Sequence, residues 1–218
     1  QTIIQGMGEL HLEILRDRML REYKVQANAG RPMVAYRETI TQAGRAEFTF
    51  ERDLGGKRHY AMVGVELEKN ERGAGNIVDF RVSSDSIPHD FRSVVEEGIH
   101  DGLSTGVLGN FPLVDIRVTV ASGRWHPVDS SEIAFRSAAS MSLREAVSSA
   151  RPALLEPIMA LEIVAPEEHL GDVLGDLNMR RGQVKDVAQR DGTRVIEASV
   201  PLAELFGYAT TLRSLTRG

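Results

Sequence analysis

The sequence predicts an α+β fold with more than one compact domain. Runs rich in β-branched and aromatic residues alternate with segments whose apolar residues recur at helical spacings of three and four. Between 157 and 218 the expected order is β-α-β-β-α, which is a ferredoxin-like split βαβ unit that lacks its last strand. Together these patterns indicate sheets covered by helices.

Composition limits the kind of protein this can be. The chain has 218 residues with 42% hydrophobic and 26% charged side chains, which is ordinary for a soluble globular protein. It has no cysteine, so disulfides, thiolate nucleophiles and cysteine-ligated zinc are excluded, which fits a reducing cytoplasm. No apolar run reaches the roughly 20 residues that a membrane helix needs. The net charge of -5 means that any contact with nucleic acid must be local.

The first 30 residues predict a short strand, a helix and a second strand. Along the helix an apolar stripe is formed by Leu12, Leu15, Met19 and Tyr23. A core made from about 35 residues would be marginal, so we expect the chain to begin partway through a domain.

The middle of the chain predicts a helix-covered sheet that ends near Pro152. The expected strands are 46–54, 58–68, 76–84 and 112–122, and the expected helices are 88–106 and 130–150. Gly55 and Gly56 form the turn between the first two strands. Glycines on one face of the first helix suggest close packing on the sheet. Asp129, three residues before Glu132, fits the N-cap of the second helix.

The last segment contains the split βαβ unit. It predicts a strand at 157–165, a helix at 166–182, two strands within 183–200 joined by an Asp-Gly turn, and a helix within 201–218. Gly182 ends the first of these helices, where a C-cap glycine is favoured. Because the last strand of the fold is missing, we expect the chain to end inside a domain.

The sequence gives little support for a catalytic or metal-binding site. His126, Asp129 and Ser130 supply the residue types of a hydrolase triad, but no G-x-S-x-G motif is present. Helix capping explains Asp129 and Ser130 better, so we predict no catalytic residue. The histidines show no i, i+4 pair that would bind a metal, and no phosphate-binding G-x-x-x-x-G-K-[ST] occurs.

Two exposed segments leave a contact with nucleic acid open, although a solvated turn is the commoner explanation for the first. Lys57, Arg58 and His59 follow the glycine pair and form a cationic hairpin tip, which is either a solvated turn or a phosphate contact. Trp125 and His126 stand side by side on a turn. The tryptophan either packs under its loop or presents its ring to a base.

A further basic cluster lies at the end of the helix predicted at 166–182. Arg180, Arg181 and Lys185 have a structural explanation as cations near a helix C-terminus.

Four blocks of the sequence resemble the C-terminal portion of the elongation factor G family of ribosomal translocation GTPases. These are "GMGELHLEILRDRMLREY…VAYRETI", "VDSSEIAFRSAAS", "LLEPIMALEI" and "RRGQV…VPLAELFGYATTLRSLTRG". The resemblance implies that residues 1–36 are the C-terminal half of domain III, that 37–153 are a ribosomal-protein-S5-like domain IV, and that 154–218 are a truncated ferredoxin-like domain V. It places the GTPase domain, with its GTP and Mg, outside this chain, which needs no cofactor of its own.

The resemblance also implies partners. Domain IV of the family reaches the tRNA–mRNA duplex in the decoding region with its tip, and domain V approaches large-subunit RNA, so both ribosomal subunits are expected partners in the cytoplasm. The residues expected to contact RNA or the ribosome are Gly55, Gly56, Lys57, Arg58, His59, Trp125, His126, Pro127, Arg180 and Arg181.

One departure from the family keeps two alternatives open. Typical translocating factors carry a longer glycine-rich tip loop, whereas this chain reads "GGKRHYAMVGV". That sequence looks closer to a recycling-type homologue, so ribosome recycling is the alternative within the family; rescue from a tetracycline-type antibiotic fits "VDSSEIAF" less well. A stand-alone RNA-binding module is the alternative outside it.

Overall fold

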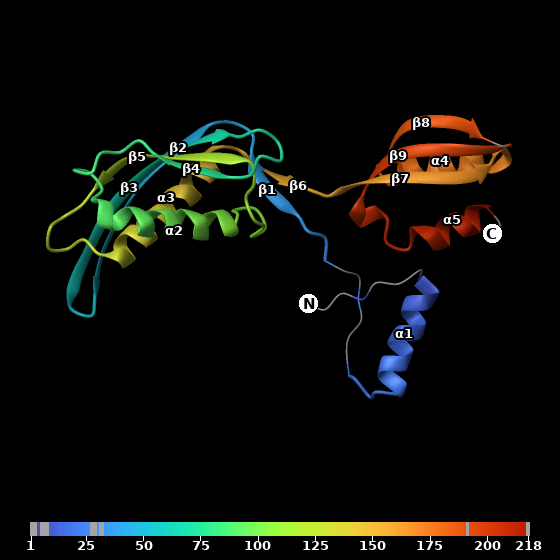
Figure 1. Ribbon diagram of the computed structural model, residues 1–218, viewed down its shortest axis with the longest axis horizontal. Coiled ribbons are helices and arrows are strands. Elements are labelled where there is room, and N and C mark those ends of the chain that lie inside the picture. Colours follow the sequence, from blue (N-terminus) through green and yellow to red (C-terminus); the bar gives the residue numbers. More distant parts are fainter. Residues whose placement is uncertain (1–3, 5–8, 27–29, 31–32, 191, 217–218) are drawn as a thin grey trace. The chain divides into compact units, whose positions relative to one another are not determined.

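The computed structural model describes the chain except residues 1–3, 5–8, 27–29, 31–32, 191 and 217–218. The chain divides into two compact units, one formed by Tyr36–Leu155 and the other containing Gln1–Ala35 and Glu156–Gly218 (Figure 1). Separate hydrophobic cores lie in the 36–155 unit and in the part from 156 onward, and the α+β prediction is confirmed.

The N-terminal segment contains helix α1, Glu9–Arg21, where the sequence predicts it. The strand expected before α1 falls mostly on residues outside the described part of the chain. The strand expected after it is not formed at 24–26, and its following residues 27–29 also lie outside the description.

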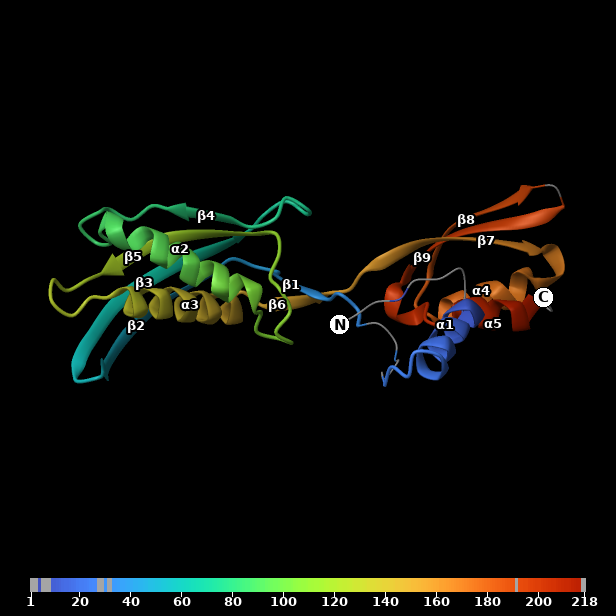
Figure 2. The ribbon, with the colours of Figure 1, turned by 60° about the horizontal axis from the view of Figure 1, so that its bottom comes forward.

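The 36–155 unit is built on a four-stranded sheet in the order β2-β3-β5-β4. Its strands are β2 Gly44–Leu54, β3 Lys57–Lys69, β4 Ile77–Phe80 and β5 Ile116–Arg124. Strands β4 and β5 are parallel and are connected through helix α2, His89–Ser104. Helix α3, Glu132–Ser149, lies beside α2 on the same face of the sheet (Figure 2).

Small residues allow the layers of this unit to approach closely. A Cβ atom on Gly98 of α2 would lie 2.4 Å from the carbonyl oxygen of Arg136 on α3. The α2 glycines therefore permit contact between helices, and the expectation that they face the sheet is wrong. Helix α3 does pack on the sheet, where Ser142 Oγ donates a hydrogen bond of 3.0 Å to the Ala46 carbonyl.

The 36–155 unit also contains a two-stranded sheet that is not predicted from the sequence. Strand β1, Arg37–Ile40, pairs antiparallel with β6, Pro152–Leu155. Glu38 on β1 is fully buried, and its carboxylate accepts hydrogen bonds from the backbone N–H groups of Val107, Leu108, Gly109 and Phe111 at 2.7–3.2 Å. Burial opposes the charged form, but these four donors outweigh it and lower the pKa of Glu38.

The part from 156 onward has the predicted β-α-β-β-α order. Its elements are β7 Ile158–Pro166, η1 Glu167–His169, α4 Leu170–Met179, β8 Gln183–Arg190, β9 Thr193–Pro201, η2 Leu202–Glu204 and α5 Tyr208–Thr216. The strands form an antiparallel sheet in the order β7-β9-β8, as a split βαβ unit requires. Val173 and Leu177 of α4 and Tyr208 of α5 share one core with β9, so both helices cover the same face.

Candidate functional site

The end of the 36–155 unit away from β1 and β6 carries two loops, which we call the tip. One is the β2–β3 hairpin and the other is the connection from β5 to α3 (Figures 1 and 2). The hairpin turn consists of Gly55 and Gly56, with φ angles of 60° and 78°, and the flanking Leu54 and Lys57 pair across it. Two successive positive φ angles define a turn that matches the twist of the strands and favours glycine.

Cationic side chains of the hairpin differ in their partners. Arg58 forms an ion pair with Glu51 across the hairpin, and the hydrogen bond to that carboxylate raises the pKa of Arg58. Lys57 is exposed, and no hydrogen bond or ion pair of its side chain occurs among the described residues.

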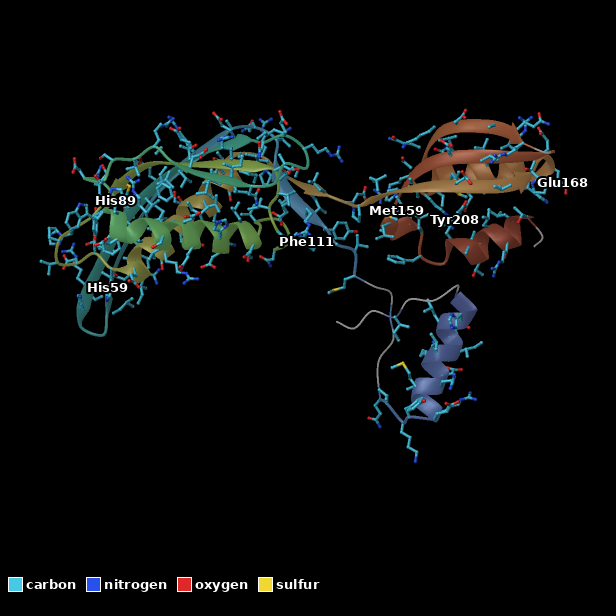
Figure 3. The ribbon with its side chains drawn as sticks, viewed as in Figure 1. His59, His89, Phe111, Met159, Glu168 and Tyr208 are labelled. Carbon is cyan, nitrogen blue, oxygen red and sulfur yellow. The ribbon has the colours of Figure 1, made fainter. Side chains whose placement is uncertain are left out.

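His59 does not extend from the cationic turn as the sequence suggested. It lies on β3 (labelled in Figure 3), and its Nδ1 is 2.6 Å from Ser131 Oγ at the start of α3. Successive side chains of a strand point to opposite faces, so His59 faces away from its neighbours Arg58 and Tyr60. His59 thereby joins the hairpin to the second loop.

The second loop is fixed to β3 by Tyr60. The backbone N–H of Tyr60 donates to the Asp129 carbonyl at 2.8 Å, and Ser130 Oγ donates to the Tyr60 carbonyl at 2.8 Å. Ser130 Oγ also accepts from the His126 backbone N–H at 2.9 Å. Two loops from distant parts of the sequence therefore form one unit.

Helix α3 is capped by a different residue from the one predicted. Ser131 is the N-cap, and its Oγ accepts from the Ala134 N–H at 3.3 Å. Asp129, the predicted cap, instead places Oδ2 3.2 Å from Nδ1 of His126, and its backbone N–H lies at the same distance from that nitrogen. Ser131 takes the cap because it directly precedes the first helical residue.

These bonds do not set up a hydrolase triad. The hydroxyl proton of Ser130 is donated to a backbone carbonyl, so it is not directed at the imidazole of His126. Asp129 and His126 are in contact, but the third member is turned toward β3. The His126 side chain stays 53% exposed and Pro127 is also exposed, so both can reach a partner molecule.

A cleft of about 460 Å³ opens between the two loops and the turn at 83–87. Its polar and aromatic lining includes Arg58, Tyr60, Asp85, Arg124, Trp125 and His126. The indole N–H of Trp125 donates to the Asp85 carbonyl at 3.0 Å, and the residue is 39% exposed. Trp125 is therefore a partly exposed residue of the cleft wall, and its contact with a base stays a prediction.

Tyr60, Asp85 and Arg124 are absent from the sequence-based prediction of this site. Arg124 directly precedes the predicted Trp125 and could have been included on that ground. Asp85 comes from a turn with no sequence signal that connects it to the tip.

The arginines at the end of α4 are bonded within the unit. Arg180 donates to Asp176 at 2.7 Å and to the Glu204 carbonyl at 2.6 Å, and its guanidinium lies 4.8 Å from the ring centre of Tyr208, which is labelled in Figure 3. Arg181 bonds both carboxylate oxygens of Glu156, at 2.8 and 3.0 Å, and these bonds raise its pKa.

Arg181 also has a backbone role. With φ of 58° it takes the left-handed position that ends a helix, and the N–H of Gly182 donates to the Leu177 carbonyl at 2.8 Å. Gly182 is the residue that must be small, since a Cβ there would lie 2.7 Å from the same carbonyl oxygen.

Neither a metal-binding group nor a membrane-spanning helix is found in the described ranges. Among those residues, no group of three His, Asp or Glu side chains is placed to hold a metal ion. Within the same ranges, no helix is both long and apolar enough to cross a membrane.

Comparisons with known proteins agree along the whole chain. Family models for domain III, domain IV and the C-terminus of elongation factor G match residues 1–31, 32–151 and 153–218. These matches define the class, a set of domains from a translation elongation factor. The chain belongs to the elongation factor G family.

Two individual proteins are similar to this chain over nearly all of its length. Elongation factor G of Chlamydia caviae is 50% identical over 218 residues, which are 100% of this chain and 31% of that protein. A crystal structure of a protein from Thermus thermophilus matches with a TM-score of 0.82 and 38% identity, over 98% of this chain and 32% of that chain. The chain thus spans about a third of the length of these relatives.

Proposed function

We propose that this chain is the ribosome-contacting C-terminal part of a translational GTPase that promotes tRNA–mRNA translocation. In this proposal the parent protein binds GTP and Mg in a GTPase domain outside the chain, acts in the cytoplasm and contacts both ribosomal subunits. The tip of the 36–155 unit contacts the tRNA–mRNA duplex in the decoding region.

The proposed domains follow the divisions expected from the sequence. Residues 1–36 belong to domain III, 37–153 to domain IV and 154–218 to domain V. The proposed boundary between the last two lies within β6, Pro152–Leu155, which pairs with β1.

The observation that carries this proposal is the joined tip. Three bonds between Tyr60 or His59 and residues 129–131 hold both loops in one arrangement, and His126 stays exposed at the tip. An exposed imidazole can donate to a phosphate or ribose oxygen. Lys57, without an intramolecular partner among the described residues, supplies a free cation on the hairpin of the same tip.

The test uses the full-length parent with GTP and ribosomes that carry peptidyl-tRNA in the pre-translocation state. We expect rapid reactivity with puromycin, slowed about tenfold or more by His126→Ala if the imidazole contact forms mainly in the transition state. His100→Ala is the matched control, because His100 is exposed on α2 and its one ion pair within the described residues is with Glu96, at 3.8 Å. Equal rates for both variants would contradict a tip role for His126.

A second candidate function is ribosome recycling. It is favoured by the short turn, since Gly55 and Gly56 alone connect β2 to β3. If the parent hydrolyses GTP on ribosomes but gives no puromycin reactivity, subunit splitting becomes the activity to measure. If the parent shows neither puromycin reactivity nor ribosome-stimulated GTP hydrolysis, both candidates are contradicted. The stand-alone RNA-binding module then remains.

A further inference from the structure

The Trp125 ring is held in a fixed position at the wall of the cleft. Its only polar side-chain atom is bonded to the backbone of the 83–87 turn, while part of the residue stays open to solvent. An aromatic ring fixed in this way offers a stacking surface, because little side-chain freedom remains to be lost when a planar ligand binds.

The cleft walls are mutually supported. A Cβ on Gly123 would lie 2.3 Å from Cγ1 of Ile87, so the end of β5 passes directly against the 83–87 turn. Tyr60 of β3, the strand paired with β5, also lines the cleft, and its backbone is bonded to residues 129 and 130. The cleft is therefore preformed by three segments, and its volume of about 460 Å³ falls in the range of small-molecule sites.

Charged groups of the cleft divide into paired and free ones. Arg58 is paired with Glu51, and Asp129 is in contact with His126. Arg124 and Asp85 line the cleft, and within the described residues their side chains have no hydrogen bond or ion pair. The cleft thus offers one free guanidinium donor and one free carboxylate acceptor beside an aromatic face.

We propose that this cleft holds one unpaired RNA nucleotide. Its base stacks on Trp125, its phosphate accepts hydrogen bonds from Arg124, and an amino group on the base donates to Asp85. Stacking on aromatic rings combined with polar contacts at the base edge is how proteins recognise single-stranded RNA. The proposal rests on the proposed function, since it assigns a second type of RNA contact to the same tip.

Trp125 makes the site directly observable, because it is the only tryptophan of the chain. The 218-residue chain is titrated with single-stranded oligoadenylate while tryptophan fluorescence is recorded. We expect saturable quenching as a base stacks on the indole. We expect an abasic oligomer of the same length and an oligo(A)·oligo(U) duplex to quench weakly, because neither presents a free base.

Two variants distinguish RNA binding in the cleft from general electrostatic attraction. Arg124→Ala is expected to weaken binding about tenfold through the loss of a charge-assisted phosphate contact. Arg72→Ala removes the same charge from an exposed residue outside the cleft and should leave binding unchanged. Because the cleft neutralises only one or two phosphates, the logarithm of affinity should fall with the logarithm of salt at a slope of about -0.7 to -1.4.

Three results would overturn the proposal. These are no quenching at millimolar oligoadenylate, equal quenching by the abasic oligomer, and equal weakening by the two arginine variants. Failure here is distinguishable from failure of the proposed function, because the puromycin assay with His126→Ala tests the tip on the ribosome without requiring a base in the cleft.

Discussion

The arginines at the tip and those at the end of α4 differ in what their guanidinium groups contact. At the tip, Arg124 has no partner among the described residues, and Arg58 has one carboxylate across its hairpin. At the helix end, Arg180 and Arg181 each bond two groups of their own unit. We therefore expect RNA contacts where the charges of a basic cluster are not already paired within the fold.

This comparison leads to unequal expectations for the two regions. Removal of a charged side chain that is hydrogen-bonded within its own unit should destabilise the protein. Removal of a charged side chain without such a partner should change binding alone. Arg124→Ala is the reference for the second case, and it should leave the unfolding of the 36–155 unit unchanged within about 0.5 kcal/mol.

The largest loss of stability is expected for a substitution at Glu38, a charged residue that is hydrogen-bonded within the unit that carries the tip. Glu38→Ala leaves four backbone N–H groups without their acceptor and should destabilise the unit by about 3–4 kcal/mol. Urea unfolding followed by Trp125 fluorescence measures this unit alone, because the tryptophan lies in it. Equal midpoints for Glu38→Ala and Arg124→Ala would break the comparison.

The second-largest loss of stability is expected for a substitution at Arg180. Its side chain is 19% exposed and that of Asp176 is 10% exposed, so Arg180→Ala leaves a largely buried carboxylate without its cation. We expect a loss of about 2–3 kcal/mol in the part from 156 onward. Hydrogen exchange of α4 and β9 amides should report faster opening there, while the amides of β3 remain protected. Unchanged exchange in α4 would mean that Arg180 is as free as a tip arginine.

The pH dependence of stability sharpens the comparison within one unit. Because the pKa of Glu38 is lower in the folded state than in the unfolded chain, its contribution is complete above the unfolded value and is lost as pH falls through the folded one. The difference in unfolding free energy between the protein and Glu38→Gln should therefore shrink as pH falls below 4.5, the ordinary pKa of a glutamate. Arg124→Ala should show the same difference from the protein at every pH in this range.

Elements with a long local pattern could be predicted from the sequence. The hairpin of β2 and β3, helices α2 and α3 and the β-α-β-β-α order all rest on periodicity within one segment. The β1–β6 pair could not be predicted, because each strand has only 4 residues and their partners come from the two ends of the unit. For the same reason nothing local identifies Glu38 as buried.

The candidate site was predictable only in part. The turn glycines and the Trp125–His126 pair were identified because turn chemistry and an exposed aromatic leave local signals. The inward direction of His59 could have been found by applying strand alternation from Arg58 onward. The use of Ser131 as the cap and of Asp85 as a cleft wall depends on how distant segments meet, which residue types alone do not reveal.

The smallest effect is expected at Arg181, and it decides whether the helix end contacts RNA. Glycine suits the left-handed backbone at this position, and the ion pairs lost in Arg181→Gly are those of a side chain that is 55% exposed. Melting of the variant should therefore change far less than that of Arg180→Ala, with the fold retained. If the full-length parent carrying Arg181→Gly also binds ribosomes normally, the cluster is structural; weaker binding with unchanged melting would show that an internally bonded arginine can exchange its carboxylate partners for RNA phosphate.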